Sequence, residues 1–182
     1  MIKYVDNLQV DEMKKIAIII PCYNVETYID RCLNSIVNQT MGVENLQVIC
    51  VDDASTDGTW QRLQAWEQQY PEDIMLIQCE KNGRQGTARN IALQYVQTDF
   101  VGFVDSDDWI EADMYEKMYE KMVQYDCDIV FCRNFRSSEY TSGGEIKRCN
   151  SEDCIYSIIS EEERKAFIVN NIIGYVCGKR LF

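Results

Sequence analysis

Short apolar segments return along the chain at regular intervals. They cover residues 16–20, 46–51, 74–79, 100–104 and 129–132. Each is four to six residues long, almost continuously apolar and rich in residues that favour strands. Such runs are typical of strands that are buried on both faces, as in a parallel sheet. We therefore predict five strands of a mostly parallel sheet.

Segments with helical spacing lie between these runs. Apolar residues recur at i, i+3 and i+4 in residues 28–37, 60–66, 88–96 and 115–122, as they do in amphipathic helices. Asp57, followed by Gly58 and Thr59, is placed to cap the second helix. An alternation of strand and helix predicts an α/β domain.

Polar residues follow the first four apolar runs directly. They are P-C-Y-N at 21–24, D-D-A-S at 52–55, E-K-N-G-R at 80–84 and D-S-D at 105–107. Ligands of parallel α/β sheets bind beyond the carboxyl ends of the strands. We therefore expect these four segments to meet at one binding site.

Composition narrows the chemistry of that site. The 182 residues include no histidine, which excludes Ser-His-Asp and Cys-His nucleophilic sites and zinc sites that use histidine. Acid–base chemistry must then rely on Asp, Glu, Lys, Tyr or Cys. A formal net charge of −12 argues against a nucleic-acid partner, because phosphate backbones select clustered Lys and Arg.

Cysteine usage and hydropathy indicate a cytosolic protein. The nine cysteines form no C-x-x-C pair, and several lie inside apolar runs, where a thiol behaves as a small hydrophobic group. No apolar run approaches the ~20 residues that a transmembrane helix needs. The N-terminus has no uninterrupted apolar core of the signal-peptide kind.

Several ligand motifs are absent or incomplete. No G-x-G-x-x-G follows the first run and no G-x-x-x-x-G-K-[ST] occurs, so dinucleotide and P-loop sites lose their main support. Two segments imitate a calcium-binding EF-hand loop. The one from Asp53 has Gln64 at its twelfth position, and the one from Asp105 has Ile110 in place of the required glycine.

The acidic cluster at residues 105–108 is open to two interpretations. Residues two apart on an extended chain point the same way, so Asp105 and Asp107 can address one site while Ser106 faces elsewhere. Paired carboxylates suit Mg²⁺ or Mn²⁺ that also binds a diphosphate. The alternative is a solvated turn in which Asp107 or Asp108 caps the next helix.

Four motifs together resemble the family 2 glycosyltransferases, which have the GT-A fold. They are I-I-I-P-C-Y-N, V-D-D-A-S-T-D-G-T, N-G-R-Q-G-T-A-R-N and F-V-D-S-D-D-W, in that order, and the resemblance covers roughly residues 15–135. It implies a nucleotide-sugar-binding core at 15–135, preceded by an N-terminal extension at 1–14. Residues 136–182 would then begin the acceptor side.

The resemblance also implies roles for individual residues. Tyr23 lies near the nucleotide base, unless it is a core aromatic residue at the strand end, and Asp53 accepts the N–H of uracil. Asp52 supports the loop or the ribose side. The remaining donor-binding residues implied are Pro21, Asn24, Glu26, Asn82, Gly83, Arg84, Asp105 and Ser106. Arg89 and Asn90 begin a helix and are assigned no binding role.

In the metal site that the resemblance implies, Asp107 ligates Mn²⁺ or Mg²⁺ at the diphosphate. Asp105 touches the ribose or the water shell of the metal. In the family the catalytic base is an Asp beyond a W-N-K-like segment, which G-Y-V-C-G-K-R-L-F at 174–182 resembles, with Lys179 at the lysine. We expect the base beyond Phe182; nothing marks Glu152, Asp153 or the glutamates at 161–163 as that base.

The activity implied is inverting transfer of a sugar from a UDP-sugar to the hydroxyl of a glycan or lipid-linked acceptor, in bacterial surface polysaccharide assembly. The enzyme would be cytoplasmic or peripheral at the inner face of the cell membrane. Two alternatives are a sugar-nucleotide nucleotidyltransferase and a non-catalytic donor-binding module. The first usually has a Gly-rich basic loop after the first strand, unlike P-C-Y-N-V-E, whereas the second fits the missing base.

Overall fold

The computed structural model describes residues 14–126, 129–132 and 175–178. Residues 1–13 of the N-terminal extension, Lys179 and the glutamates at 161–163 lie outside these ranges, as does most of the region 136–182 that we assign to the acceptor side.

The described strands form one mixed sheet of six. They are β1 (Ile16–Cys22), β2 (Leu46–Asp52), β3 (Ile74–Gln78), β4 (Phe100–Phe103), β5 (Ile129–Phe131) and β6 (Tyr175–Gly178), in the order β3-β2-β1-β4-β6-β5. β1 to β4 run parallel, while β6 is antiparallel to β4 and β5. The five predicted strands are confirmed to within two residues at each end. β6 was not predicted, because its apolar run is too short to stand out.

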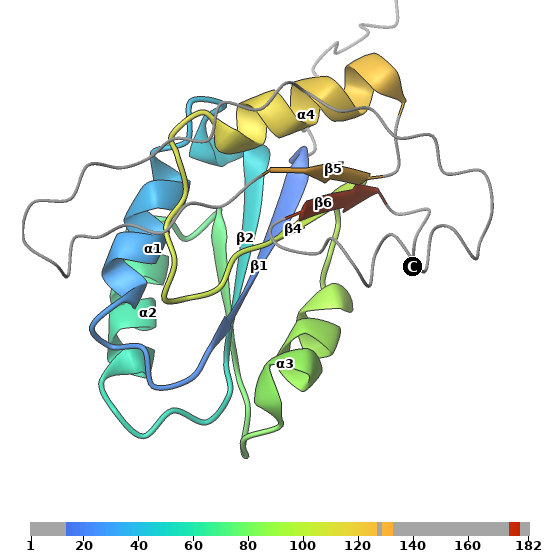
Figure 1. Cartoon of the computed structure of the whole chain (residues 1–182). Coiled ribbons are helices and arrows are strands. Elements are labelled where there is room, and N and C mark those ends of the chain that lie inside the picture. Colours follow the sequence, from blue (N-terminus) through green and yellow to red (C-terminus); the bar gives the residue numbers. More distant parts are fainter. Residues whose placement is uncertain (1–13, 127–128, 133–174, 179–182) are drawn as a thin grey trace, which may run out of the picture.

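Helices cover both faces of this sheet (Figure 1). They are α1 (Ile29–Val37), α2 (Thr59–Gln69), α3 (Arg84–Leu93) and α4 (Met114–Tyr125), with a short 3₁₀ helix, η1 (Val43–Asn45). The four predicted helices are present. The third begins five residues before Arg89 and ends before Tyr95, so the prediction that Arg89 and Asn90 begin it is wrong.

The core explains why the strands read as continuous apolar runs. Alternate residues of β1 face opposite ways: Ile16, Ile18 and Ile20 pack with α1, α2 and α4, whereas Ala17 and Ile19 pack with α3. Every residue of β1 and β2 is buried. A strand that is covered on both faces gains from an apolar side chain at every position.

The strand order creates a switch point beside β1. The chain passes outward from β1 through β2 to β3, then returns by α3 to form β4 on the other side of β1. A crevice opens at the carboxyl ends of the strands where the direction of such a sheet reverses. The loops after β1, β2 and β3 lie together at this edge, at the bottom of Figure 1.

Two further observations concern the described residues. None of their helices is both long and apolar enough to cross a membrane. Cys22, Cys32, Cys50, Cys79 and Cys132 are all free thiols.

Candidate functional site

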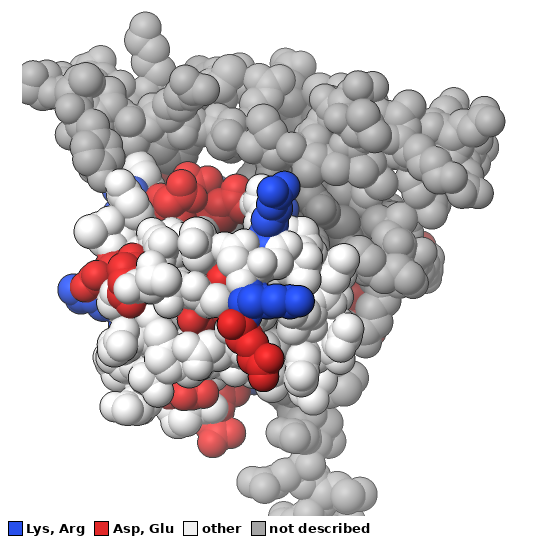
Figure 2. Space-filling view, turned by 90° about the horizontal axis from the view of Figure 1, so that it is seen from below, with Lys and Arg blue, Asp and Glu red and all other residues white. Residues whose placement is uncertain are grey.

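A cavity of ≈380 Å³ lies at the carboxyl edge of the sheet. Its lining residues come from the tips of β1, β2 and β3: Pro21, Cys22, Tyr23, Asp53, Asn82, Arg84 and Gln85. Five of these seven belong to the predicted donor-binding set. Cys22 lies within the expected P-C-Y-N segment, although no role of its own was assigned to it, and Gln85, which directly follows Arg84, was missed. Figure 2 looks onto this edge and shows basic side chains beside acidic ones near its centre.

Asp53 is the buried acidic group of this cavity. It is only 2% exposed, and its Oδ1 accepts the backbone N–H of Gly83 at 2.8 Å. Its Oδ2 is also buried, yet accepts no hydrogen bond in the described part of the protein. Leaving a buried polar atom without a partner costs about 1–3 kcal/mol. Such an atom at a cavity wall is available to a hydrogen-bond donor of a bound ligand.

Non-glycine residues with left-handed backbone follow β1, β2 and β3. They are Asn24 (φ 52°), Ala54 (φ 61°) and Arg84 (φ 69°). This conformation costs roughly 1–2 kcal/mol for an L-residue. Hydrogen bonds hold two of the three: Thr56 N–H donates to Asn24 Oδ1 at 2.8 Å, and Arg84 N–H to Asn82 Oδ1 at 3.0 Å. Strained backbone of this kind clusters at binding sites.

The loop after β1 is fastened to the start of α2. Val25 N–H donates to Thr59 Oγ1 at 2.8 Å, and Glu26 N–H donates to Asp57 Oδ2 at 3.2 Å. In return, Gly58 N–H donates to Glu26 Oε2 at 3.0 Å. A Cβ at Gly58 would lie too close to this carboxylate, so any other residue there would push the Glu26 side chain aside. Glu26 thus braces two loops and does not line the cavity.

Two predicted acidic residues support the loop after β2. Asp57 Oδ1 accepts the N–H of Thr59 at 3.0 Å beside the start of α2, but the N-cap of that helix is Gly58, so the prediction that Asp57 caps it is wrong by one residue. Burial works to raise the pKa of Asp57, but hydrogen bonds from Thr59 and from backbone N–H groups outweigh it and lower the pKa. Asp52 is fully buried and accepts the N–H of Ser55 at 3.2 Å. Its place matches the loop-supporting role suggested for it.

The D-S-D segment alternates in exposure as predicted. Asp105 and Asp107 are exposed, whereas Ser106 between them is buried. Asp105 Oδ1 accepts a hydrogen bond from Arg89 NH2 at 2.6 Å, as part of an ion pair. Among the described residues, the Asp107 carboxylate accepts no hydrogen bond, and its backbone oxygen accepts one from Arg31 at 3.4 Å.

Helix capping does not explain the acidic cluster. α4 begins at Met114 with Asp113 as its N-cap, so the alternative in which Asp107 or Asp108 caps it is wrong. Asp108 instead closes a turn by donating its N–H to Asp105 O at 3.0 Å. Burial, and next the carboxylates of Asp107 and Asp105, raise the pKa of Asp108, which Arg31 partly opposes.

The acidic cluster at 105–108 suits a divalent cation only if a bound substrate supplies further ligands. No three His, Cys, Asp or Glu side chains in the described ranges gather as a complete metal site. Asp105 and Asp107 nevertheless offer two exposed carboxylates, two positions apart in the turn that Asp108 N–H closes on Asp105 O. Mg²⁺ and similar hard ions commonly bind one or two carboxylates together with substrate phosphates. The residues therefore fit a cation that arrives with a diphosphate.

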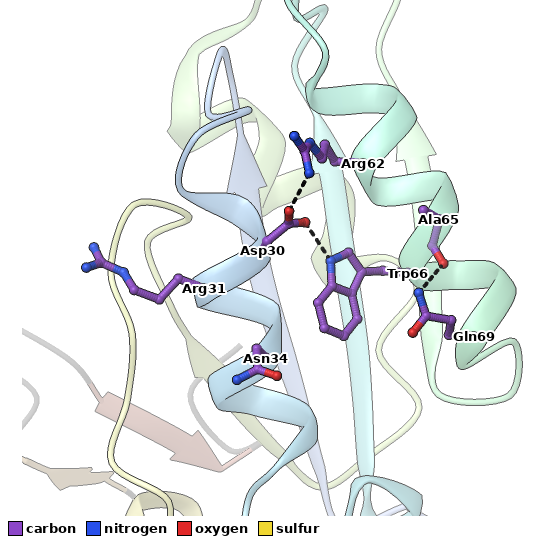
Figure 3. Close-up of a pocket in the computed structure, with 7 residues that line it drawn as sticks. All are labelled: Asp30, Arg31, Asn34, Arg62, Ala65, Trp66 and Gln69. Atoms are coloured by element: carbon purple, nitrogen blue, oxygen red, sulfur yellow. Dashed lines mark hydrogen bonds and ion pairs between the residues drawn. The ribbon is translucent and has the colours of Figure 1, made fainter.

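A second and larger cavity lies between α1 and α2 (Figure 3). It measures ≈630 Å³ and is lined by Asp30, Arg31, Asn34, Arg62, Ala65, Trp66 and Gln69. Asp30 accepts hydrogen bonds from Arg62 at 2.7 Å and from Trp66 Nε1 at 2.9 Å. Its central carboxylate is thus already satisfied on both oxygens. The cavity at the strand tips, with its unpaired Asp53 oxygen, is the better candidate.

Comparison with known proteins agrees with the fold and with the motifs. The model of the glycosyl transferase family 2 matches residues 17–182. The chain therefore belongs to the family 2 glycosyltransferases.

The relatives are longer than this chain. Glycosyltransferase GlyA of Streptococcus pneumoniae is 34% identical over 177 residues, which cover 92% of this chain but 25% of GlyA. The chain thus spans about a quarter of that relative. Staphylococcus aureus TarS, a poly(ribitol-phosphate) β-N-acetylglucosaminyltransferase, is 40% identical over 99 residues, 54% of this chain and 17% of TarS.

Solved structures confirm the architecture as that of GT-A glycosyltransferases. TarS 1–349 in complex with UDP superposes with a TM-score of 0.60 at 32% identity, over 70% of this chain and 40% of the other. The mannosyltransferase PcManGT of Pyrobaculum calidifontis, in complex with GDP-Man and Mn²⁺, gives a TM-score of 0.61 at 26% identity. That match covers 66% of this chain and 36% of the mannosyltransferase.

Proposed function

We propose that this chain is the donor-binding part of a metal-dependent glycosyltransferase that uses a UDP-sugar. The sugar passes with inversion to the hydroxyl of a glycan or lipid-linked acceptor, in surface polysaccharide assembly at the cytoplasmic side of the membrane. The poly(ribitol-phosphate) named for TarS is an acceptor of this general kind.

The observation that carries the proposal is the unpaired Oδ2 of Asp53. A buried carboxylate oxygen requires a hydrogen-bond donor, and uracil presents a single imide N–H at its base-pairing edge. Tyr23 lines the same cavity and is 47% exposed, so its ring is free to stack on a base. Stacking on aromatic side chains is a common way to hold nucleobases.

We assign the diphosphate to the space between two strand tips. Asn82, Gly83 and Arg84 lie beside Asp53 at the end of β3, and Arg84 is exposed and brings positive charge. Asp107 is the ligand that we assign to Mn²⁺ or Mg²⁺, with Asp105 beside it. When bound, the cation neutralises the charge that develops on the departing UDP. A carboxylate base from outside the described residues removes the proton of the acceptor hydroxyl.

Calorimetric titration of the 182-residue chain with UDP, GDP and CDP, with and without Mn²⁺, tests the proposal. We expect UDP to bind best and Mn²⁺ to strengthen its binding. Asp107→Ala should remove the effect of Mn²⁺ and leave the metal-free affinity nearly unchanged.

A variant of Asp53 tests recognition of the nucleobase directly. Asp53→Asn keeps an oxygen for Gly83 N–H but presents an amide donor to the base, where uracil also presents a donor. We expect UDP affinity to fall by about 10-fold or more, since a hydrogen bond to a charged group contributes about 1.5–3 kcal/mol. CDP, whose ring nitrogen is an acceptor at that position, should lose less or gain.

The proposal fails if wild-type chain binds none of the three nucleotides. It also fails if Mn²⁺ does not change the affinity for UDP, or if Asp53→Asn lowers the affinities for UDP and CDP equally.

A further inference from the structure

Arg89 joins the helix α3 to the acidic segment after β4. It lies in the middle of α3, between the buried residues Ala88 and Ala92 that pack against the sheet. Its guanidinium reaches across the ring of Phe103, 5.8 Å from the ring centroid, to Asp105. Because Phe103 and Asp105 are two residues apart, an extended chain places both on this side.

The ion pair is short and partly shielded from solvent. Arg89 NH2 lies 2.6 Å from Asp105 Oδ1, and the two side chains are 31% and 52% exposed. The Nε of Arg89 is buried and donates to no acceptor among the described residues. While the guanidinium is bound to Asp105, its Nε–H therefore lacks a hydrogen-bond acceptor among the described residues.

The Arg89–Asp105 ion pair offsets part of the charge repulsion within residues 105–108. Three carboxylates stand within four positions, at 105, 107 and 108, and like charges this close repel. Arg31 also brings positive charge to this segment. Its guanidinium stacks on Trp109 at 3.8 Å and donates a hydrogen bond to the backbone oxygen of Asp107. Arg89 is the arginine that binds a carboxylate of the proposed metal-binding pair directly.

We propose that Arg89 is a positioning residue that acts as a built-in counter-ion: paired with Asp105, it opposes binding of a divalent cation until a diphosphate arrives. This inference rests on the proposed donor site. A guanidinium at one carboxylate of the pair repels a metal ion approaching the other and denies it a second ligand. A nucleoside diphosphate reverses the balance, because it brings negative charge and further oxygen ligands.

The consequence is a coupling between the two ligands. If the chain binds Mn²⁺ poorly alone and well with UDP, then UDP must also bind better with Mn²⁺, by the same factor. Removing the charge of Arg89 should strengthen binding of Mn²⁺ alone and reduce this factor. If Arg89 only stabilised the fold, its substitution would weaken the binding of both Mn²⁺ and UDP and would not strengthen the binding of either.

The test measures Mn²⁺ binding without nucleotide, by electron paramagnetic resonance of the free ion, and then UDP binding at several Mn²⁺ concentrations. Arg89→Gln removes the charge yet can still donate to Asp105, and Arg89→Met serves as a second neutral variant. Arg89→Lys keeps the charge. Arg62→Met is the matched control, since it removes one positive charge from an exposed ion pair with Asp30, in the other cavity.

We expect Arg89→Gln and Arg89→Met to bind Mn²⁺ alone about tenfold more tightly, which corresponds to about 1.4 kcal/mol, and to lose most of the coupling to UDP. Arg89→Lys and Arg62→Met should stay near wild type in binding of Mn²⁺ alone. Circular dichroism checks that each variant is folded, and whichever neutral variant folds decides the question.

Unchanged or weaker Mn²⁺ binding in the folded neutral variants would overturn the inference, as would an equal gain in Arg62→Met. If wild-type chain fails to bind UDP even with Mn²⁺, the proposed function itself is at fault. If UDP binding depends on Mn²⁺ as expected but the Arg89 substitutions do not change Mn²⁺ binding, only this inference is refuted and the proposed function stands.

Discussion

Four aspartates at the strand tips show how one residue type acquires different roles. Asp52 is buried and bonded within its loop, while Asp53 is buried with one oxygen unpaired. Asp105 is paired with Arg89, and the carboxylate of Asp107 accepts no hydrogen bond among the described residues. Neighbouring donors and solvent exposure therefore decide which carboxylate supports the fold and which can meet a ligand.

Asp108 allows a test at the scale of the residue. Its pKa is raised above the ordinary value of 3.8 by burial and by the neighbouring carboxylates, so its ionised form destabilises the folded state above the raised pKa. That cost disappears as the pH falls through it. We expect Asp108→Asn to raise the thermal midpoint at pH 7 without divalent ions, and the gain to vanish below about pH 4.

Thermal unfolding followed by circular dichroism between pH 3 and pH 7 measures this effect. Glu72→Gln, at an exposed position between α2 and β3, removes the same charge away from the acidic cluster. A gain for Asp108→Asn that is equal at all pH values, or matched by Glu72→Gln, would contradict the prediction.

At the scale of the element, the site depends on loops that brace one another. Thr59, the first residue of α2, is fully buried and accepts the N–H of Val25. Its hydroxyl also donates to Asp57 Oδ1 at 2.6 Å. One hydroxyl group thus ties the loop after β1, which carries Tyr23, to the loop after β2, which carries Asp53.

Thr59→Val keeps the shape of the side chain but leaves Val25 N–H without an acceptor. We expect a loss of about 1–3 kcal/mol in the free energy of unfolding, the cost of an unsatisfied buried donor, together with weaker UDP binding. Thr59→Ser retains the hydroxyl and should stay closer to wild type in both measurements. Denaturant unfolding and UDP titration report the two quantities, and equal effects of Val and Ser would refute the role of the hydroxyl.

At the scale of the whole molecule, stability and binding are divided between the central strands and the loops at their carboxyl ends. β1 and β2 are buried along their whole length, whereas Met75 and Gln78 of β3 are exposed. The candidate site sits in the loops at the carboxyl ends. Rigid central strands thus carry loops whose conformation a ligand can still influence.

Hydrogen exchange followed by mass spectrometry tests this division. We expect amides of β1 and β2 to exchange slowest, by global unfolding, and those of β3 to exchange sooner. UDP with Mn²⁺ should protect residues 22–26, 53–58, 82–85 and 105–108 and leave 42–45 and 70–73, at the other ends of the strands, unchanged. Protection at 42–45 or 70–73 instead would place the ligand elsewhere.

Most strands and helices could be predicted because their signals are local. Burial on both faces requires apolar residues at nearly every position of β1 and β2, and amphipathic helices repeat at fixed spacing. Their alternation then implies that Asp53, Arg84 and Asp105 follow strands at one edge of the sheet. Gln85, the residue of the strand-tip cavity that was missed, carries no distinctive chemistry in the sequence.

The sequence by itself determined the alternation of strands and helices, the family and the polar tips, because each depends on residue types at short spacing. Only the tertiary structure decided three points. β6 pairs with β4 although some 70 residues separate them in the chain; Arg89 reaches Asp105 from another element; and one oxygen of Asp53 stays unpaired. These depend on which distant groups come into contact, and local spacing carries no information about such contacts.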